Sequence, residues 1–106
     1  MSSQNLSSFD KSDIGDCSHL NVGIVCSKWN SDITENLYDG AFSTLLELGI
    51  NKNNIISIKV PGSFELVYGA NKMSKKNVDV IICLGCVIRG ETSHFDYICN
   101  SVSNGI

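Results

Sequence analysis

The sequence predicts a layered α/β fold in which parallel strands alternate with helices. Two observations lead to this prediction. Short, continuous apolar runs occur three times along the chain, and a segment with helical spacing of apolar residues follows each of them. A continuous apolar run is typical of a strand that is buried on both faces, as the strands of parallel sheets are. Right-handed crossovers join such strands, so we expect helices on the faces of one sheet.

The first strand is expected over residues 21–26 (Asn-Val-Gly-Ile-Val-Cys), and a helix follows it. Asn30 or Ser31 is a typical N-cap for that helix, and Gly49 is expected to end it. The apolar residues of the helix recur at helical spacing and therefore fall on one inward-facing stripe. The stripe comprises Ile33, Leu37, Ala41, Leu45 and Leu48.

The second strand is expected over residues 55–60, and Pro61-Gly62 ends it. Ser63 is a typical cap for the helix that comes next. The apolar residues expected to face the sheet from this helix are Leu66, Val67, Ala70 and Met73.

The third strand is expected over residues 78–84, and its helix begins near Glu91 or Thr92. Residues 20–106 together form the predicted domain. Residues 1–19 are expected to be a flexible polar arm, because they are rich in Ser and Asp. The arm lacks the basic and apolar segments of a secretory signal, which predicts a cytoplasmic protein.

Composition and charge exclude several classes of protein. The chain has 106 residues, enough for one domain, and its 42% of hydrophobic residues excludes disorder throughout. A net charge of −3 argues against a partner that is nucleic acid or an anionic membrane surface. The apolar runs all fall short of the roughly 18–20 residues of a membrane span.

Three unusual segments directly follow the three predicted strands, and they cover residues 27–30, 61–65 and 85–94. Ligands of open parallel sheets bind beyond the carboxyl ends of the strands, so we expect a pocket where these segments meet. Trp29 is the only tryptophan and lies in the first segment. Its ring is either a stacking platform for a planar heterocycle or a hydrophobe that packs on the start of the helix, and both interpretations stay open.

The third segment contains two glycines and leads into a helix, where free backbone N–H groups can bind a phosphate. An ordinary strand-to-helix loop is the alternative. His94 is expected in the first turn of that helix, where the helix dipole favours the neutral imidazole and makes it a candidate base. Arg89 either faces an anion or is simply solvated.

The five cysteines are expected to be reduced thiols. Cys83 and Cys86 form a C-x-x-C pair, but Cys83 falls within a predicted strand, where positions three apart point to opposite faces. A redox or zinc pair is therefore disfavoured. Cys86 with His94 lacks an orienting third group for nucleophilic catalysis, and no set of three or four metal ligands stands out.

Read together, the three segments resemble the 6,7-dimethyl-8-ribityllumazine synthase family. The resemblance rests on Val22-Gly23-Ile24-Val25 with Trp29-Asn30, on residues 60–65 (Val-Pro-Gly-Ser-Phe-Glu), and above all on residues 85–95 (Gly-Cys-Val-Ile-Arg-Gly-Glu-Thr-Ser-His-Phe). It covers the chain from about residue 20 to the end. It implies a flavodoxin-like, three-layer α/β/α fold with strand order 2-1-3 for the part present, incomplete at the C-terminus.

The resemblance also implies a reaction and a set of site residues. The family condenses 5-amino-6-(D-ribitylamino)uracil with 3,4-dihydroxy-2-butanone 4-phosphate, without a metal or other cofactor. His94 is the implied catalytic residue, and Trp29 would stack on the pyrimidine. The residues implied to bind the pyrimidine substrate are Trp29, Ser63, Phe64, Glu65, Cys86, Val87 and Ile88. Glu91 and Thr92 would meet the butanone phosphate, and Glu91 would do so through its backbone amide, because its carboxylate would repel the phosphate.

The same resemblance implies protein partners, and it implies that the chain is only part of the family's domain. Family members form homopentamers or sixty-mers, and riboflavin synthase is a candidate partner. They also continue beyond the matched part, so the sequence would supply the N-terminal two-thirds of the domain, and the 106-residue chain alone is expected to be unstable or inactive. Two other functions stay open: an inactive remnant of the enzyme, and a flavodoxin-like module that binds a flavin or a phosphorylated ligand.

Overall fold

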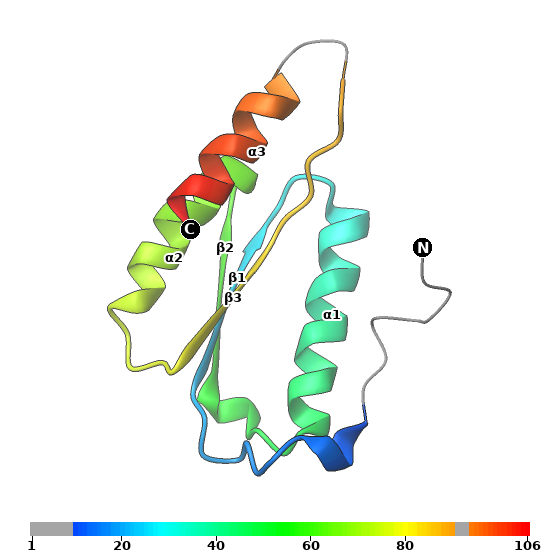
Figure 1. The fold of residues 1–106 in the computed structure, drawn as a ribbon, viewed down its shortest axis with the longest axis vertical. Coiled ribbons are helices and arrows are strands. Elements are labelled where there is room, and N and C mark those ends of the chain that lie inside the picture. The colour runs from blue at the N-terminus through cyan, green and yellow to red at the C-terminus, as the bar shows by residue number, and fades with distance from the viewer. Residues whose placement is uncertain (1–9, 91–93) are drawn as a thin grey trace.

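Three parallel strands form the centre of the molecule, in the order β2-β1-β3 (Figure 1). The structure is a computed structural model that describes residues 10–90 and 94–106. The strands are β1 (Val22–Ser27), β2 (Ile55–Val60) and β3 (Val80–Leu84). In the register of the sheet, Val22 lies opposite Ile55 on one side and Val80 on the other. The predicted parallel α/β fold and its strand order are confirmed.

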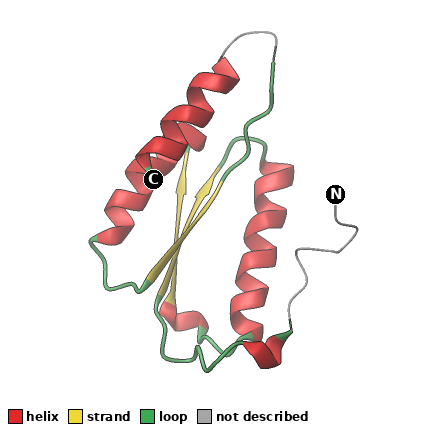
Figure 2. Ribbon diagram, in the orientation of Figure 1, coloured by secondary structure: helices red, strands yellow, loops and turns green. Residues whose placement is uncertain are grey.

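Helices cover both faces of this sheet (Figure 2). The helices are α1 (Ser31–Glu47), α2 (Leu66–Ser74) and α3 (His94–Gly105), and the short 3-10 turns are η1 (Lys11–Asp13), η2 (Lys52–Asn54) and η3 (Ser63–Glu65). The helix α1 lies on one face, and α2 and α3 lie on the other. The part of the chain described here has no helix that is both long enough and apolar enough to cross a membrane.

The core has two halves, one on each face of β1, because successive side chains of a strand point in opposite directions. Val22 and Ile24 pack with Leu45 and Ile50 on the face covered by α1. The second half is formed by Val25, Val60, Leu66 and Met73 on the face covered by α2. All of β1 is buried, whereas every described residue of β3 stays at least partly accessible.

The predicted stripe of α1 is wrong in its first turns. Ile33 and Leu37 are 45% and 42% exposed, while the buried residues of the helix are Thr34 and Leu45. The buried face begins at Thr34, whose backbone carbonyl accepts a bond from the Cys26 thiol of β1. Because adjacent helix positions lie about 100° apart, this rotation turns Ile33 away from the sheet. Leu45, which the prediction shares, is buried as expected.

The predicted end of α1 agrees with the structure. Gly49 has a φ of +93°, and its N–H donates to Leu46 O while the N–H of Ile50 donates to Leu45 O. This pair of bonds is the Schellman arrangement, in which a residue in the left-handed region ends the helix. Glycine fits that position because it lacks the Cβ that makes the conformation costly for other residues.

Ser63 does not cap a helix in the predicted way. It lies in η3, and α2 begins afterwards with Glu65 at its N-cap position and no side-chain cap bond. The Ser63 hydroxyl instead reaches the loop that follows β3. The third helix begins in the structure at His94, and the predicted start at Glu91 or Thr92 lies outside the described residues.

Candidate functional site

The loops after the three strands meet at the carboxyl edge of the sheet, as the topology requires. The loop after β1 is bonded to the end of β2: the N–H of Lys28 donates to Val60 O at 2.9 Å, and the N–H of Trp29 donates to Pro61 O at 3.2 Å. The loop after β3 is bonded to both others through the backbone oxygen of Cys86. This oxygen accepts from Asn30 Nδ2 at 3.4 Å and from Ser63 Oγ at 3.2 Å.

A pocket of about 580 Å³ opens between these loops and the first turns of α3, and we call it the strand-end pocket. Its lining includes every predicted site residue that the structure describes, namely Trp29, Ser63, Phe64, Glu65, Cys86, Val87, Ile88 and His94. Glu91 and Thr92, which were predicted to bind phosphate, lie outside the described residues. A concave, largely apolar pocket with a few polar groups is the usual form of a small-molecule site.

Trp29 lies over the backbone of the second loop. A Cβ added to Gly62 would come within 2.9 Å of Trp29 Cδ1, which is closer than side chains normally approach. Gly62 has an extended backbone (φ −144°, ψ −180°) that any residue adopts, so the contact with the ring is what requires glycine here. Trp29 as a whole is 69% exposed, so most of its surface stays accessible. An indole held in this way offers a flat apolar surface to a ligand.

His94 is the first residue of α3 and is exposed at the wall of the strand-end pocket. Its neighbour Arg89, at the end of the preceding loop, forms an ion pair with Asp96 at 3.3 Å. The guanidinium of Arg89 also lies 4.3 Å from the centre of the Phe95 ring. Arg89 thus contacts α3, and its side chain is still 64% exposed, which agrees with the interpretation of a solvated arginine.

All five cysteines are free in this structure. Burial raises the pKa of the Cys26 and Cys83 thiols, which keeps both neutral and makes them poor nucleophiles. Within residues 10–90 and 94–106, no group of three or more His, Cys, Asp or Glu side chains is placed to hold a metal ion.

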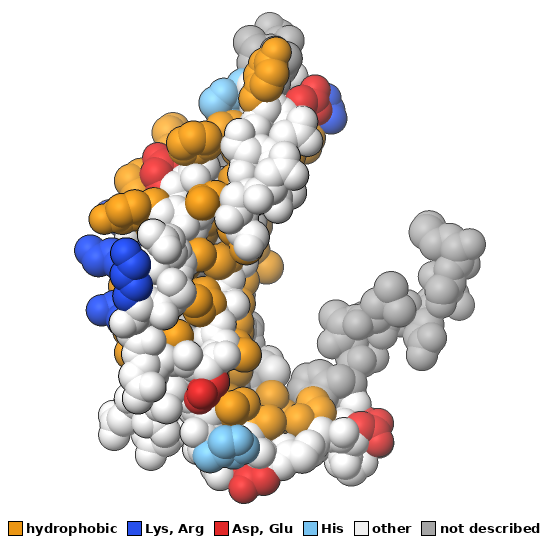
Figure 3. All heavy atoms as spheres, turned by 60° about the vertical axis from the view of Figure 1, so that its left-hand side comes forward, with side chains coloured by type: hydrophobic (Ala, Val, Ile, Leu, Met, Phe, Trp, Pro, Cys, Tyr) orange, Lys and Arg blue, Asp and Glu red, His pale blue; other side chains and the backbone are white. Residues whose placement is uncertain are grey.

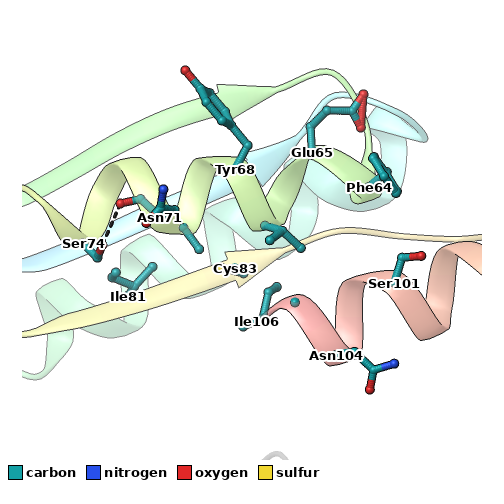
Figure 4. Close-up of a pocket in the computed structure, with 13 residues that line it drawn as sticks. Phe64, Glu65, Tyr68, Asn71, Ser74, Ile81, Cys83, Ser101, Asn104 and Ile106 are labelled. Atoms are coloured by element: carbon teal, nitrogen blue, oxygen red, sulfur yellow. Dashed lines mark hydrogen bonds between the residues drawn. The ribbon is translucent and has the colours of Figure 1, made fainter.

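A larger hollow of about 1120 Å³ lies beside the strand-end pocket, between α2, β3 and α3, and we call it the lateral groove (Figure 4). Ile81 and Cys83 of β3 form its floor, and Tyr68 of α2 and Ile106 of the C-terminal end stand at its sides. The two hollows share Phe64 and Glu65. The lateral groove lacks the histidine and the stacking ring of the strand-end pocket, so we place the candidate site in the smaller hollow.

Three residues that line the strand-end pocket, Asn30, Gly62 and Ile98, are not among the site residues that the sequence predicts. Asn30 was interpreted only as a helix cap, although asparagine is also the residue type that most readily replaces glycine in the left-handed region. It has φ 58° and ψ 54°. Ile98 lies one helical turn after His94, and this spacing places both on one face of α3.

The fold and the pocket together define a class: an α/β protein with a parallel sheet that binds a small molecule at the carboxyl ends of its strands. The comparisons with known proteins are more specific. The sequence model of the family 6,7-dimethyl-8-ribityllumazine synthase matches residues 19–106. This chain belongs to the 6,7-dimethyl-8-ribityllumazine synthase family.

Several curated relatives carry the same name. The protein from Parabacteroides distasonis is 49% identical over 97% of this chain and 65% of its own length. Those from Flavobacterium johnsoniae and Cytophaga hutchinsonii are 51% and 56% identical over 97% of this chain, and the matched part is 55% and 65% of their respective lengths. The chain therefore spans less than two-thirds of the curated relatives it matches.

Proposed function

We propose that this chain supplies the pyrimidine-binding site of a 6,7-dimethyl-8-ribityllumazine synthase. The substrates would be 5-amino-6-(D-ribitylamino)uracil and 3,4-dihydroxy-2-butanone 4-phosphate. The observation that carries the proposal is the strand-end pocket, because three segments far apart in the sequence contribute its stacking ring, its polar backbone and its histidine. These are the segments on which the resemblance to the family rests.

Each part of the pocket has a proposed role. Trp29 would stack on the pyrimidine, a contact that contributes on the order of 1–3 kcal/mol. The backbone of Phe64 and Glu65, at the turn before α2, would bind the polar edge of the substrate together with Ser63. Residues 86–88 would hold the pyrimidine from the third strand. The backbone of Glu91 and Thr92 would bind the phosphate.

His94 would transfer protons in this reaction. The substrate amine attacks the ketone carbonyl and water leaves to give an imine, phosphate is then eliminated, and the second amine closes the ring with loss of another water. Each step moves a proton to or from nitrogen or oxygen, and an exposed histidine at the pocket wall can serve as the carrier. The reaction is redox-neutral, so it needs neither an oxidant nor a reductant.

The proposal extends to assembly and location. A homo-oligomer, either a pentamer or a sixty-mer, would cover apolar residues that are exposed in the single chain, among them Phe64 at 57% and Ile88 at 62%. Riboflavin synthase is the proposed protein partner, since it would use the lumazine product. Free thiols at all five cysteines support a cytoplasmic location.

The test is formation of the fluorescent lumazine from the two substrates by the purified protein, with the enzyme-free rate subtracted. We expect His94→Ala to lower kcat by about 10²–10⁴-fold, the usual contribution of a positioned acid–base group. His19→Ala is the matched control, because His19 precedes β1 and lies outside the strand-end pocket. Equal rates in the wild type and His94→Ala would contradict the role of His94. Tight flavin binding without turnover would favour a binding module instead.

A further inference from the structure

The Cys86 carbonyl connects all three strand-end loops. It accepts one hydrogen bond from Asn30 Nδ2, in the loop after β1, and one from Ser63 Oγ, in the turn after β2. The distances are 3.4 Å and 3.2 Å, and the partners lie 56 and 23 residues away along the chain. A carbonyl oxygen has two lone pairs, so these two side chains satisfy it completely. We call this arrangement the carbonyl clamp.

Both donors are residue types that normally cap helices, and neither makes a cap bond here. Asn30 is the N-cap residue of α1, but its side chain makes no cap hydrogen bond. Its backbone lies in the left-handed region, and among the described residues it is the only one other than glycine with a positive φ. A conformation that costs free energy persists only where other contacts determine it, and the bond to Cys86 is such a contact.

Close packing beneath the third loop lets Ser63 reach the carbonyl. A Cβ at Gly85 would lie 2.8 Å from Ser63 Oγ and 2.7 Å from Leu66 Cδ1. Ser63 is also buried, at 8% exposure, so its hydroxyl has little water to bond instead. Gly85, which has no side chain, therefore leaves room for the Ser63 hydroxyl below it.

The clamp determines the direction of one backbone donor. The peptide bond between Cys86 and Val87 is planar and trans, so the N–H of Val87 points opposite to the Cys86 carbonyl. Fixing the carbonyl toward Asn30 and Ser63 fixes that N–H as well. We propose that Asn30 and Ser63 are positioning residues that orient the Cys86–Val87 peptide so that the Val87 N–H binds the heterocycle in the strand-end pocket. This inference rests on the proposed function, because it assumes that residues 86–88 hold the pyrimidine.

Three variants test the clamp with little other change. Ser63→Ala removes one donor. Asn30→Gly removes the other and keeps a residue that accepts the left-handed backbone, while Asn30→Asp keeps the shape but cannot donate. Asn51→Gly and Ser43→Ala are matched controls, because their side chains form local hydrogen bonds away from the strand-end pocket.

The first readout is amide hydrogen exchange of the peptide covering residues 85–90, measured without substrate. We expect faster exchange in the clamp variants than in the wild type and the controls. Unchanged exchange in both Ser63→Ala and Asn30→Gly would overturn the clamp, whether or not the protein binds the pyrimidine. This readout therefore separates the clamp from the proposed function.

The second readout is the Kd of 5-amino-6-(D-ribitylamino)uracil, followed by the fluorescence of Trp29, the only tryptophan. Each single variant should raise the Kd about 2- to 10-fold, the effect of losing one hydrogen bond. Ser63→Ala with Asn30→Gly should raise it by more than the product of the two, because the carbonyl then keeps neither donor. Faster exchange with an unchanged Kd would overturn the positioning role. Absence of binding in the wild type would contradict the proposed function, and exchange alone would then decide the clamp.

Discussion

At the scale of single residues, the contacts of Trp29 give the clearest indication of a side chain's role. A large aromatic ring that is 69% exposed gains little from burial, so packing on the helix start explains its position poorly. The ring rests instead on Gly62, where only a hydrogen fits. Of the two interpretations left open by the sequence, this geometry favours the stacking platform.

Gly62→Ala should therefore weaken ligand binding more than it weakens folding. The added methyl group meets the indole at 2.9 Å and must displace it, while the extended backbone of Gly62 suits alanine. We expect a Kd for the pyrimidine raised about 3- to 10-fold, a part of the stacking contribution, and a free energy of unfolding within about 0.5 kcal/mol of the wild type. Fluorescence titration and urea unfolding measure the two quantities. Gly15→Ala, where the added atom meets nothing within 4 Å, is the control. An unchanged Kd would argue that the ring does not stack on the ligand.

The thiols of Cys26, which is buried, and Cys83, which is partly buried, should react slowly and become more reactive as the pH rises. Burial raises the pKa of Cys26 and Cys83 above the ordinary value of 9.0, so the reactive thiolate is scarcer at pH 8 in the folded protein than in the unfolded chain. Alkylation by iodoacetamide, mapped by mass spectrometry, should be slower at these positions in buffer than in urea. Equal rates would contradict their burial.

The same pKa shifts predict how the free energy of unfolding changes with pH. A group whose pKa is higher in the folded state stabilises the fold while it is protonated, and this contribution is lost as the pH rises through the unfolded and then the folded pKa. The free energy of unfolding should accordingly fall above about pH 9 through these two thiols.

At the scale of elements, Gly40 within α1 and Gly49 just after its end should respond to alanine in opposite directions. Gly49 ends the helix at φ +93°, so Gly49→Ala places a Cβ in the left-handed region and should cost about 1 kcal/mol. Gly40 lies exposed within α1, where a Cβ meets nothing, so Gly40→Ala should stabilise by about 0.5–1 kcal/mol. Chemical unfolding of both variants measures the difference. A stabilising Gly49→Ala would contradict the Schellman end of the helix.

The strands were the most predictable elements, because their apolar runs are almost continuous. The second strand was predicted over its full range, and the first was displaced by one residue, since Ser27 still pairs with Val60. The rotation of α1 was not predictable from its own apolar residues. Tyr38 also packs on the core, and its hydroxyl shares a hydrogen bond with Ser57 on β2. A stripe counted from aliphatic residues alone leaves out such contacts.

The composition of the strand-end pocket followed from a rule of topology, since loops after parallel strands share one edge. The hydrogen bonds between the loops that line it could not be predicted from this rule. Nothing local in the sequence tells that Asn30 and Ser63, each typical of a helix cap, donate to one distant carbonyl. Side-chain partners across different loops depend on the register of the strands, which short-range patterns do not contain.

At the scale of the whole molecule, the two faces of the sheet differ in how well they are covered. The long helix α1 lies along one face, whereas α2 and α3 leave the lateral groove open over β3. Figure 3 shows a band of hydrophobic side chains over this side of the molecule. Among the residues that line the lateral groove, Tyr68 is 65% exposed and Ile106 is 61% exposed. Such a large apolar surface marks a site of association or a tendency to aggregate.

A chain of residues 1–106 expressed by itself should therefore bind a hydrophobic dye and associate as its concentration rises. Tyr68→Lys and Ile106→Lys each place a charge on this surface at an exposed position, so they should lower association while changing the free energy of unfolding by less than about 1 kcal/mol. Leu46→Lys is the matched control, because Leu46 is 42% exposed on α1, away from the lateral groove.

Sedimentation velocity over a range of concentrations, with dye fluorescence alongside, distinguishes the outcomes. If both lysine variants remain monomeric where the wild type and Leu46→Lys associate, the surface over β3 is the contact. If all of them associate alike, the contact lies elsewhere, and a wild type that stays monomeric without binding dye would contradict the argument from exposed area. The lateral groove and the strand-end pocket share Phe64 and Glu65. Association through the lateral groove would therefore change the wall of the strand-end pocket. We therefore expect pyrimidine affinity to rise with protein concentration in the wild type and to stay constant in Tyr68→Lys.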